Sequence, residues 1–229
     1  MNVPPQLPAL IFDLDGTLTD SKPGIVACLR KVLDARGLTI EGSLDRFVGP
    51  PVEEWVAELA PGLTHEKRTE LARQYRDLYG REGWNNNSVY AGIQHMLANL
   101  QREGFPLYVC TSKHHSFAVR ILDLFELSGY FRAVYGDKPE YLSHSKADLL
   151  ARLMGDCGLA AATSWMIGDR SYDIQAAQAN EVGSIAAAWG YGSRQEWAKA
   201  DVIAISPDQV RGLAIATSRK SLVKVSSPA

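Results

Sequence analysis

Short apolar runs that alternate with amphipathic stretches constrain the fold of this 229-residue chain more than any other feature. The runs have the length of buried strands, and the stretches between them carry apolar residues at helical spacing. Strands that alternate with helices predict right-handed βαβ units and an open parallel sheet, so we expect an α/β fold. The expected strands are Ala9–Phe12, Leu107–Cys110, Ala133–Tyr135, Ser164–Ile167, Ser184–Ala187 and Val202–Ala204.

One block interrupts this alternation directly after the first expected strand. From Ser21 to Gly83 the apolar residues keep helical spacing and no strand is evident. A polar turn cluster at residues 85–88 follows the block. We therefore predict a helical domain over residues 19–85, inserted into an α/β domain made of residues 1–18 and 86–229.

The composition indicates where the protein is located and which classes of partner it does not bind. Lysine and arginine number 24 and aspartate and glutamate 26, so the formal net charge of −2 leaves no basic excess for binding nucleic acid or anionic lipid. No apolar run approaches the roughly 20 residues of a membrane-spanning helix, and the N-terminal sequence lacks a secretory-signal pattern. The three cysteines are far apart, as in proteins of a reducing compartment. We expect a cytoplasmic monomer or weak homodimer that binds neither nucleic acid nor membrane.

Acidic side chains follow two of the expected strands at the point where each strand ends. Asp13 and Asp15 lie two residues apart after the first strand, so both carboxylates face one side of an extended segment, and Asp169 follows a later strand. Ligands of open α/β sheets bind beyond the carboxyl ends of the strands. Because hard oxygen ligands suit Mg²⁺, three converging carboxylates predict a magnesium site formed by Asp13, Asp15 and Asp169.

The other polar groups near strand ends suit phosphoryl transfer. A carboxylate can attack phosphorus and form an aspartyl-phosphate, and a neighbouring carboxylate can protonate the leaving oxygen and later take a proton from water. The metal ion and Lys146 would neutralise charge on the phosphoryl oxygens, and Thr111 can donate a hydrogen bond to one of them. The sequence thus predicts an enzyme that acts on a small phosphorylated metabolite.

Four parts of the chain resemble the four signatures of the haloacid dehalogenase superfamily, in the order in which that family has them. The helical insert resembles the small α-helical cap of the family. The resemblance implies a Rossmann-like catalytic core with an inserted cap and a magnesium-dependent phosphatase, with phosphoglycolate as the best single substrate candidate and a nucleotide or sugar phosphate close behind. The parts similar to the signatures are Ile11–Leu18, Val109–Ser112, Lys146 and Gly168–Asp173, and Val48–Trp55 and Ala188–Gly192 are similar to the phosphoglycolate-phosphatase-like branch.

The same resemblance implies catalytic and metal-binding roles. Asp13 would be the nucleophile and a metal ligand. Asp15 would be the acid and base, and it would bind the metal through its backbone carbonyl. Asp169 would ligate the metal, and Asp173 would order the metal's water molecules or Lys146.

A second group of residues is expected around the phosphate and the rest of the substrate. Thr111, Ser112 and Lys146 would hold the phosphate, and Gly16 would let the chain turn tightly beside it. Arg46, in the helical insert, is a candidate for the substrate pocket.

Several alternatives stay open at this point. Lys138 rivals Lys146 as the phosphate lysine, and we favour Lys146 because it begins an expected helix. Lys113 is interpreted as a solvated lysine outside the site. A sugar phosphomutase is an alternative enzyme, although Ile25 stands where that branch carries a cap histidine. A phospho-aspartate signalling or binding module is an alternative of another class, but such a module needs no cap and has no counterpart of Asp15.

Overall fold

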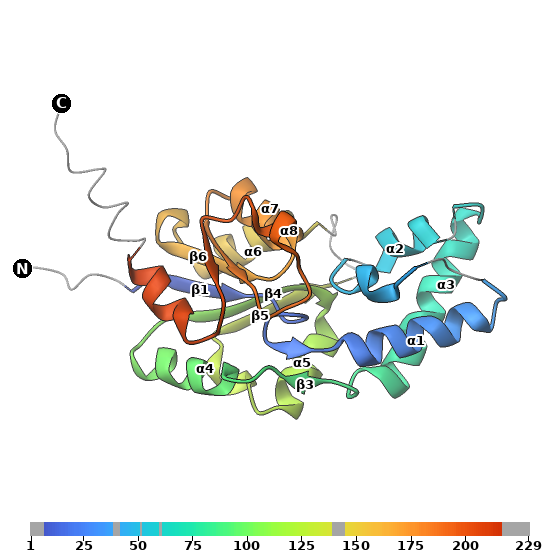
Figure 1. Cartoon of the computed structure of the whole chain (residues 1–229), viewed down its shortest axis with the longest axis horizontal. Coiled ribbons are helices and arrows are strands. Elements are labelled where there is room, and N and C mark those ends of the chain that lie inside the picture. Colours follow the sequence, from blue (N-terminus) through green and yellow to red (C-terminus); the bar gives the residue numbers. More distant parts are fainter. Residues whose placement is uncertain (1–6, 39–41, 51, 60, 139–144, 217–229) are drawn as a thin grey trace, which may run out of the picture.

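The expected strands form one six-stranded sheet in the computed structural model, which describes residues 7–38, 42–50, 52–59, 61–138 and 145–216. All neighbouring strands are parallel, in the order β5-β4-β1-β6-β7-β8. Figure 1 labels β1, β4, β5 and β6 of this sheet. The prediction of an open, Rossmann-like parallel sheet is confirmed. The strands are β1 Ala9–Phe12, β4 Leu107–His114, β5 Ala133–Asp137, β6 Ser164–Gly168, β7 Gly183–Ala187 and β8 Val202–Ala204.

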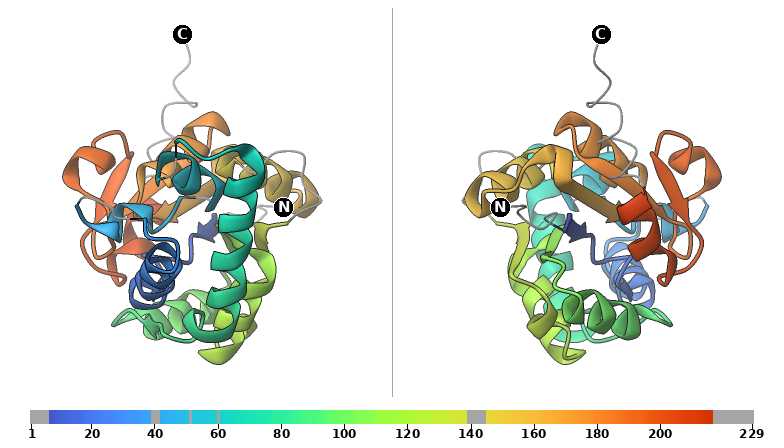
Figure 2. Two further views of the ribbon diagram at one scale, coloured as in Figure 1. Left: turned by 90° about the vertical axis from the view of Figure 1, so that its right-hand side faces the viewer. Right: turned by 90° about the vertical axis from the view of Figure 1, so that its left-hand side faces the viewer.

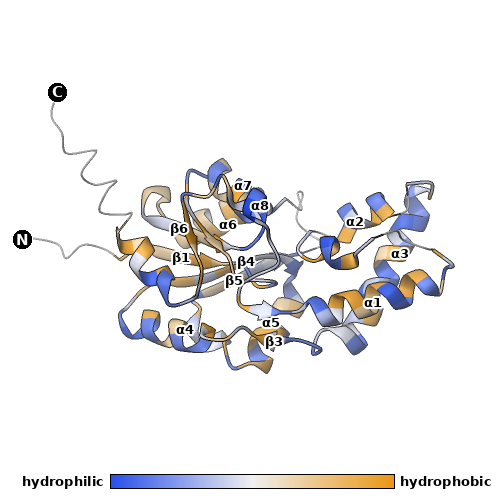
Figure 3. Ribbon diagram, viewed as in Figure 1, coloured by the Kyte–Doolittle hydropathy of each residue, from blue (hydrophilic) through white to orange (hydrophobic). Residues whose placement is uncertain are grey.

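Helices cover both faces of the sheet. Alternate residues of β1 enter different cores, since Leu10 and Phe12 pack with the helices on one face and Ala9 and Ile11 with those on the other. Figure 3 shows the strands as predominantly hydrophobic, as expected for a sheet buried on both faces. The helices on the Phe12 face are α4 Ile93–Arg102 and α5 His115–Leu124, those on the Ile11 face are α6 Lys146–Cys157 and α7 Ser171–Ala179, and α8 is Arg194–Trp197. Short 3₁₀ turns occupy Ser128–Tyr130 (η3) and Ala161–Thr163 (η4).

A separate helical lobe lies beyond one end of the sheet (Figures 1 and 2). It has a hydrophobic core of its own, in which Leu29, Leu71 and Tyr75 are buried. The left view of Figure 2, from the side of this lobe, shows its helices in front of the sheet. The elements of the lobe are α1 Lys22–Asp34, the 3₁₀ helix η1 Leu44–Phe47, α2 Val52–Leu59, α3 His65–Leu78 and the π-helical turn η2 Tyr79–Gly83.

The two chain segments that join the lobes pair with each other. Strands β2 (Thr19–Asp20) and β3 (Ser88–Val89) form a short antiparallel ribbon, which was not predicted from the sequence. Within the part of the chain described by the structure, no helix is both long and apolar enough to cross a membrane.

Candidate active site

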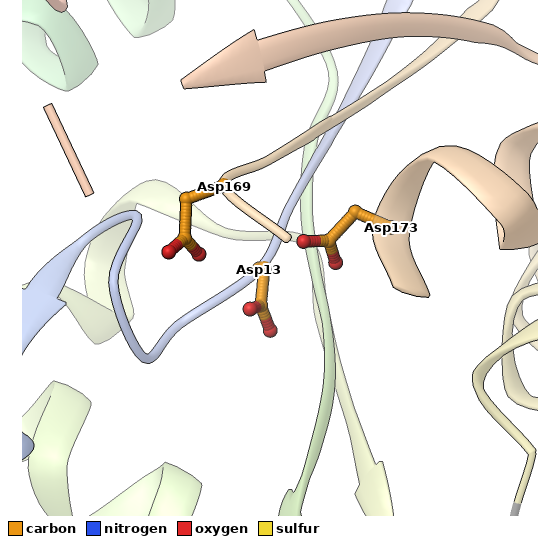
Figure 4. A group of neighbouring side chains, drawn as sticks. All are labelled: Asp13, Asp169 and Asp173. Carbon is orange, nitrogen blue, oxygen red and sulfur yellow. The ribbon is translucent and has the colours of Figure 1, made fainter. Parts of the chain in front are cut away.

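Three aspartates come together at the carboxyl ends of β1 and β6. Asp13 follows β1, Asp169 follows β6 and Asp173 lies in the first turn of α7. Oxygen atoms of the three carboxylates lie within 4.8 Å of one another, and all three residues are buried. Figure 4 shows these side chains converging from their separate elements. The backbone N–H of Asp13 donates to the Ile167 carbonyl at 2.8 Å, which ties the end of β1 to β6.

Lys146 lies against two of these carboxylates. Its Nζ is 2.7 Å from Asp13 Oδ1 and 2.5 Å from Asp173 Oδ1. The residue begins α6, which Ser145 caps by accepting a hydrogen bond from the Asp148 N–H at 3.1 Å. The position of Lys146 beside Asp13 favours it over Lys138, which follows β5.

The cluster concentrates negative charge away from water. Burial raises the pKa of Asp13 to about 7; Lys146 opposes this rise and Asp173 adds to it. Burial, with the charges of Asp173 and Asp13, also raises the pKa of Asp169 well above its ordinary value. One lysine beside three buried carboxylates leaves the cluster short of positive charge, and its hard oxygen donors fit a divalent cation such as Mg²⁺.

Close-packed backbone fixes the orientation of Asp169. A Cβ at Gly16, whose φ is +85°, would lie 2.4 Å from Asp169 Oδ2, so only glycine fits at this point. Asp169 Oδ2 accepts a hydrogen bond from the Tyr191 N–H at 2.7 Å, and Oδ1 accepts one from Thr17 Oγ1 at 3.3 Å. Neither Thr17 nor Tyr191 was predicted to have a role at the site, although Thr17 lies in the Ile11–Leu18 segment and Tyr191 in the Ala188–Gly192 segment.

The side chain of Asp15 faces a different set of groups. Its Oδ1 accepts a hydrogen bond from Ser21 Oγ at 2.5 Å, and its Oδ2 lies 3.0 Å from Lys113 Nζ. Among the described residues, the three-carboxylate cluster therefore contains Asp173 in place of the Asp15 side chain expected from the sequence. The chain turns directly after Asp13, with the Leu18 N–H bonded to the Leu14 carbonyl at 2.9 Å, and the carboxylates of Asp13 and Asp15 contact different lysines.

The expected phosphate-binding residues lie along the end of β4. Thr111 is buried, and its Oγ1 accepts a hydrogen bond from the Lys113 N–H at 3.3 Å. Ser112 lines the pocket beside Asp15. The interpretation of Lys113 as solvated is wrong, because its side chain is only 7% exposed. Its place directly after Thr111 and Ser112, at a strand end, was the available signal.

Arg46 lies away from this group. Its guanidinium pairs with Glu58 at 3.1 Å and stacks 4.5 Å from the centre of the Phe47 ring. Of the residues that the structure describes, those lining the pocket beside Asp15 do not include Arg46. The expectation that Arg46 binds substrate therefore gains no support from this geometry.

A pocket of about 560 Å³, its open mouth included, lies between the two lobes beside Asp15. The helical lobe contributes mainly apolar and aromatic side chains, and the sheet lobe contributes polar groups from the end of β4. The wall includes Ile25, Phe47, Val52, Trp55, Tyr75 and Tyr79 from the helical lobe, and Asp15, Ser112, Lys113, His114, Phe117 and Asp137 from the sheet lobe.

Comparison with known proteins gives consistent matches over most of the chain. Residues 10–187 match the family model described as haloacid dehalogenase-like hydrolase. The chain is 38% identical over 190 residues to the tyrosine-protein kinase PtkA of Mycobacterium tuberculosis, a match that covers 82% of this chain and 64% of that protein. It is 35% identical over 191 residues to a 5′-nucleotidase of Pseudomonas aeruginosa, covering 82% of this chain and 86% of the relative.

A solved structure has the same architecture over most of the chain. The crystal structure of a predicted phosphatase from Clostridium acetobutylicum superimposes with a TM-score of 0.86 at 35% identity, covering 92% of this chain and 100% of that one. The resemblance inferred from the four sequence signatures is thereby confirmed.

Proposed function

The chain belongs to the haloacid dehalogenase-like hydrolase family, and on that premise we propose that it is a magnesium-dependent phosphatase of small phosphate monoesters. The observation that carries the proposal is the position of Asp13 at the end of β1, with Lys146 at 2.7 Å and the carboxylates of Asp169 and Asp173 beside it. A carboxylate in such a place can attack phosphorus while fixed charges balance the phosphoryl oxygens.

The proposed reaction has two steps. An oxygen of Asp13 bonds to phosphorus as the bond from phosphorus to the ester oxygen breaks, and Asp15 gives that oxygen a proton. Water then attacks the aspartyl-phosphate and gives a proton to Asp15, which frees Asp13 and inorganic phosphate. Thr111, Ser112 and Lys146 hold the phosphoryl group throughout.

Mg²⁺ is the proposed cofactor. Asp13 and Asp169 would ligate it through their side chains and Asp15 through its backbone carbonyl, while Asp173 would hold Lys146 in place. Bound there, the ion would neutralise charge on the phosphoryl group.

The wall of the pocket supports an ester whose alcohol part is neutral. Both the lysine and the arginine of the described wall are already paired, Lys113 with Asp15 and Arg76 with Glu53. A second carboxylate, as in phosphoglycolate, would have to displace one of these partners, whereas a nucleoside would meet the apolar wall of Phe47, Trp55 and Phe117. We therefore place a nucleoside monophosphate ahead of phosphoglycolate.

We propose that the helical lobe, made of residues 19–85, acts as a cap. Arg170, next to Asp169, donates a hydrogen bond to the Val48 carbonyl of that lobe and pairs with Glu196 of the sheet lobe at 2.8 Å. Contacts of this kind would hold the cap shut over the substrate and keep bulk water out, and their release would let the product leave.

The kinase relative suggests a second outcome of the same chemistry, transfer of the phosphoryl group to tyrosine. Attack on phosphorus by Asp13 would be common to both reactions, and the acceptor of the second step would differ. Asp15, which lines the pocket and can take the proton that an attacking water loses, supports water as the acceptor.

The test is a phosphate-release screen with Mg²⁺ over nucleoside monophosphates, sugar phosphates, phosphoglycolate and p-nitrophenyl phosphate, scored by kcat/KM. We expect kcat/KM to be higher for a nucleoside monophosphate than for phosphoglycolate. A parallel incubation with ATP and a tyrosine peptide measures phosphopeptide. Release of no phosphate from any ester, or formation of phosphopeptide without it, would refute the phosphatase proposal.

A further inference from the structure

Lys113 connects the proposed acid and base to the helical lobe. Its Nζ lies 3.0 Å from Asp15 Oδ2 and donates a hydrogen bond to the Tyr79 hydroxyl at 3.0 Å. The same ammonium sits 4.5 Å from the centre of the Tyr79 ring. Lys113 and Asp15 belong to the sheet lobe and Tyr79 begins η2 of the helical lobe, so one cation links the two lobes at the edge of the pocket.

The partners of Lys113 fix its charge in place. The Lys113 side chain is only 7% exposed, and its ammonium lies between the Asp15 carboxylate and the Tyr79 hydroxyl, 3.0 Å from each. Tyr79 is itself held by a stacked Tyr75 at 5.8 Å and an edge-on Phe117 at 5.3 Å. The ammonium therefore has little freedom while the lobes remain in this arrangement.

The carboxylate of Asp15 is held at both oxygens. Ser21 Oγ bonds Oδ1 and Lys113 faces Oδ2, so the rotamer of the side chain depends on both groups. A cation at 3.0 Å from Oδ2 also stabilises the negative charge that Asp15 gains when it gives up a proton.

We propose that Lys113 is a positioning residue that couples closure of the helical lobe, through Tyr79, to proton transfer by Asp15. This inference rests on the proposed phosphatase function. In the first step Asp15 gives its proton to the ester oxygen as that oxygen leaves phosphorus and Asp13 bonds to phosphorus. Lys113 holds the resulting carboxylate beside the pocket. When the lobe opens, Tyr79 leaves with it and Lys113 loses one of its two partners.

Esters with different leaving groups separate this role from a purely structural one. An alkyl oxygen needs a proton to leave, whereas p-nitrophenolate leaves without one. The parameter to measure is kcat/KM, because it covers the steps up to the loss of the alcohol and excludes hydrolysis of the aspartyl-phosphate. The two substrates are p-nitrophenyl phosphate and the best nucleoside or sugar phosphate of the screen.

The variants are Lys113→Met, Lys113→Arg and Tyr79→Phe, with Lys31→Met as the matched control. Lys31 is another lysine paired with a carboxylate, Glu82 at 2.6 Å, but it is exposed and is not one of the residues of the described pocket wall. Because general acid catalysis contributes about 10²–10⁴-fold, we expect Lys113→Met to lower kcat/KM for the alkyl ester by at least about tenfold more than for p-nitrophenyl phosphate.

The other variants test the hydroxyl of Tyr79, the charge at position 113 and the specificity of the effect. Tyr79→Phe keeps the ring and removes the hydroxyl, so we expect the same selective loss to a smaller extent. Lys113→Arg restores part of the alkyl-ester rate, and Lys31→Met leaves both rates unchanged. Thermal unfolding of each variant reports its fold independently of activity.

The outcomes distinguish failure of the role proposed for Lys113 from failure of the proposed function. Equal losses for both esters, or no loss, would overturn the role of Lys113 while the activity of the wild-type protein upholds the proposed function. An inactive wild-type protein would instead refute the proposed function, and this inference with it. If Lys113→Met does not fold, the ratio of the two rates in Tyr79→Phe decides, and an unchanged ratio there overturns the proposal.

Discussion

The environment of Asp13 combines burial with an imbalance of charge. Two other carboxylates and one ammonium surround it, and burial raises its pKa to about 7. A carboxyl group with such a pKa is partly neutral near neutral pH in the metal-free protein. The uncharged isostere asparagine therefore replaces it with little electrostatic disturbance.

Asp13→Asn tests the nucleophile. An amide cannot form the aspartyl-phosphate, so we expect turnover to fall by roughly 10⁴-fold or more, as when other catalytic nucleophiles are removed. The melting temperature should stay close to that of the wild-type protein. Phosphate release and thermal unfolding measure the two quantities, and substantial residual turnover by the variant would rule out covalent catalysis at this residue.

Gly16→Ala tests the fit of the chain around Asp169. The added methyl group would lie 2.4 Å from Asp169 Oδ2, at a backbone φ of +85°. We expect at least about a tenfold loss of Mg²⁺ affinity, because the carboxylate must move to make room. Gly37→Ala is the control, since Gly37 also has a positive φ, +63°, but nothing within 4 Å of an added Cβ. Titration calorimetry with Mg²⁺ compares them, and equal affinities in both variants would contradict the prediction.

The two lysines show where prediction from sequence succeeds and where it stops. Lys146 was predictable because it begins a helix with Leu149 and Leu150 behind it, and such a start lies at the carboxyl end of the sheet. The place of Lys113 near a strand end was likewise visible in the sequence, but its burial was not, because its partner Tyr79 comes from the helical lobe. Local patterns report the element that carries a residue, but not a partner contributed by another lobe.

At the scale of elements, the parallel sheet follows from strand and helix periodicity alone. The ribbon of β2 and β3 and the π-helical turn η2 do not, since two-residue strands and a single wider turn leave no periodic signal. Asp15 illustrates the consequence for the site. Asp13 directly follows β1, whereas Asp15 lies in the turn over Leu14–Leu18, and its side chain contacts Ser21 and Lys113.

Gly24→Ala tests how closely α1 and η2 pack in the helical lobe. A Cβ at Gly24 would lie 2.0 Å from the Gly83 carbonyl oxygen, so the two segments must separate. We expect a loss of about 1–3 kcal/mol in the free energy of unfolding, as in other overpacked sites. Gly155→Ala in α6 is the matched control, because an added methyl group there meets nothing within 4 Å and raises helix propensity. Chemical denaturation measures both changes, and a stability of Gly24→Ala equal to wild type would contradict the close packing.

At the scale of the whole molecule, the fold keeps three buried carboxylates together, with one lysine in contact among the residues that the structure describes. That arrangement opposes folding, and a bound divalent cation would relieve the repulsion between the carboxylates. Because Mg²⁺ would bind the folded chain and not the unfolded one, stability should rise with its concentration.

Thermal unfolding with and without Mg²⁺ tests this linkage without relying on activity. At a concentration of about 100 times the dissociation constant we expect a gain of roughly 2.7 kcal/mol, which excess chelator reverses while it also stops phosphate release. Asp169→Asn should lose most of the gain. Asp77→Asn should keep it, because Asp77 is an exposed acid of the helical lobe that pairs with Arg73 at 2.7 Å. A melting temperature that does not change with Mg²⁺, or an equal shift in both variants, would show that Asp169 does not ligate the ion as proposed.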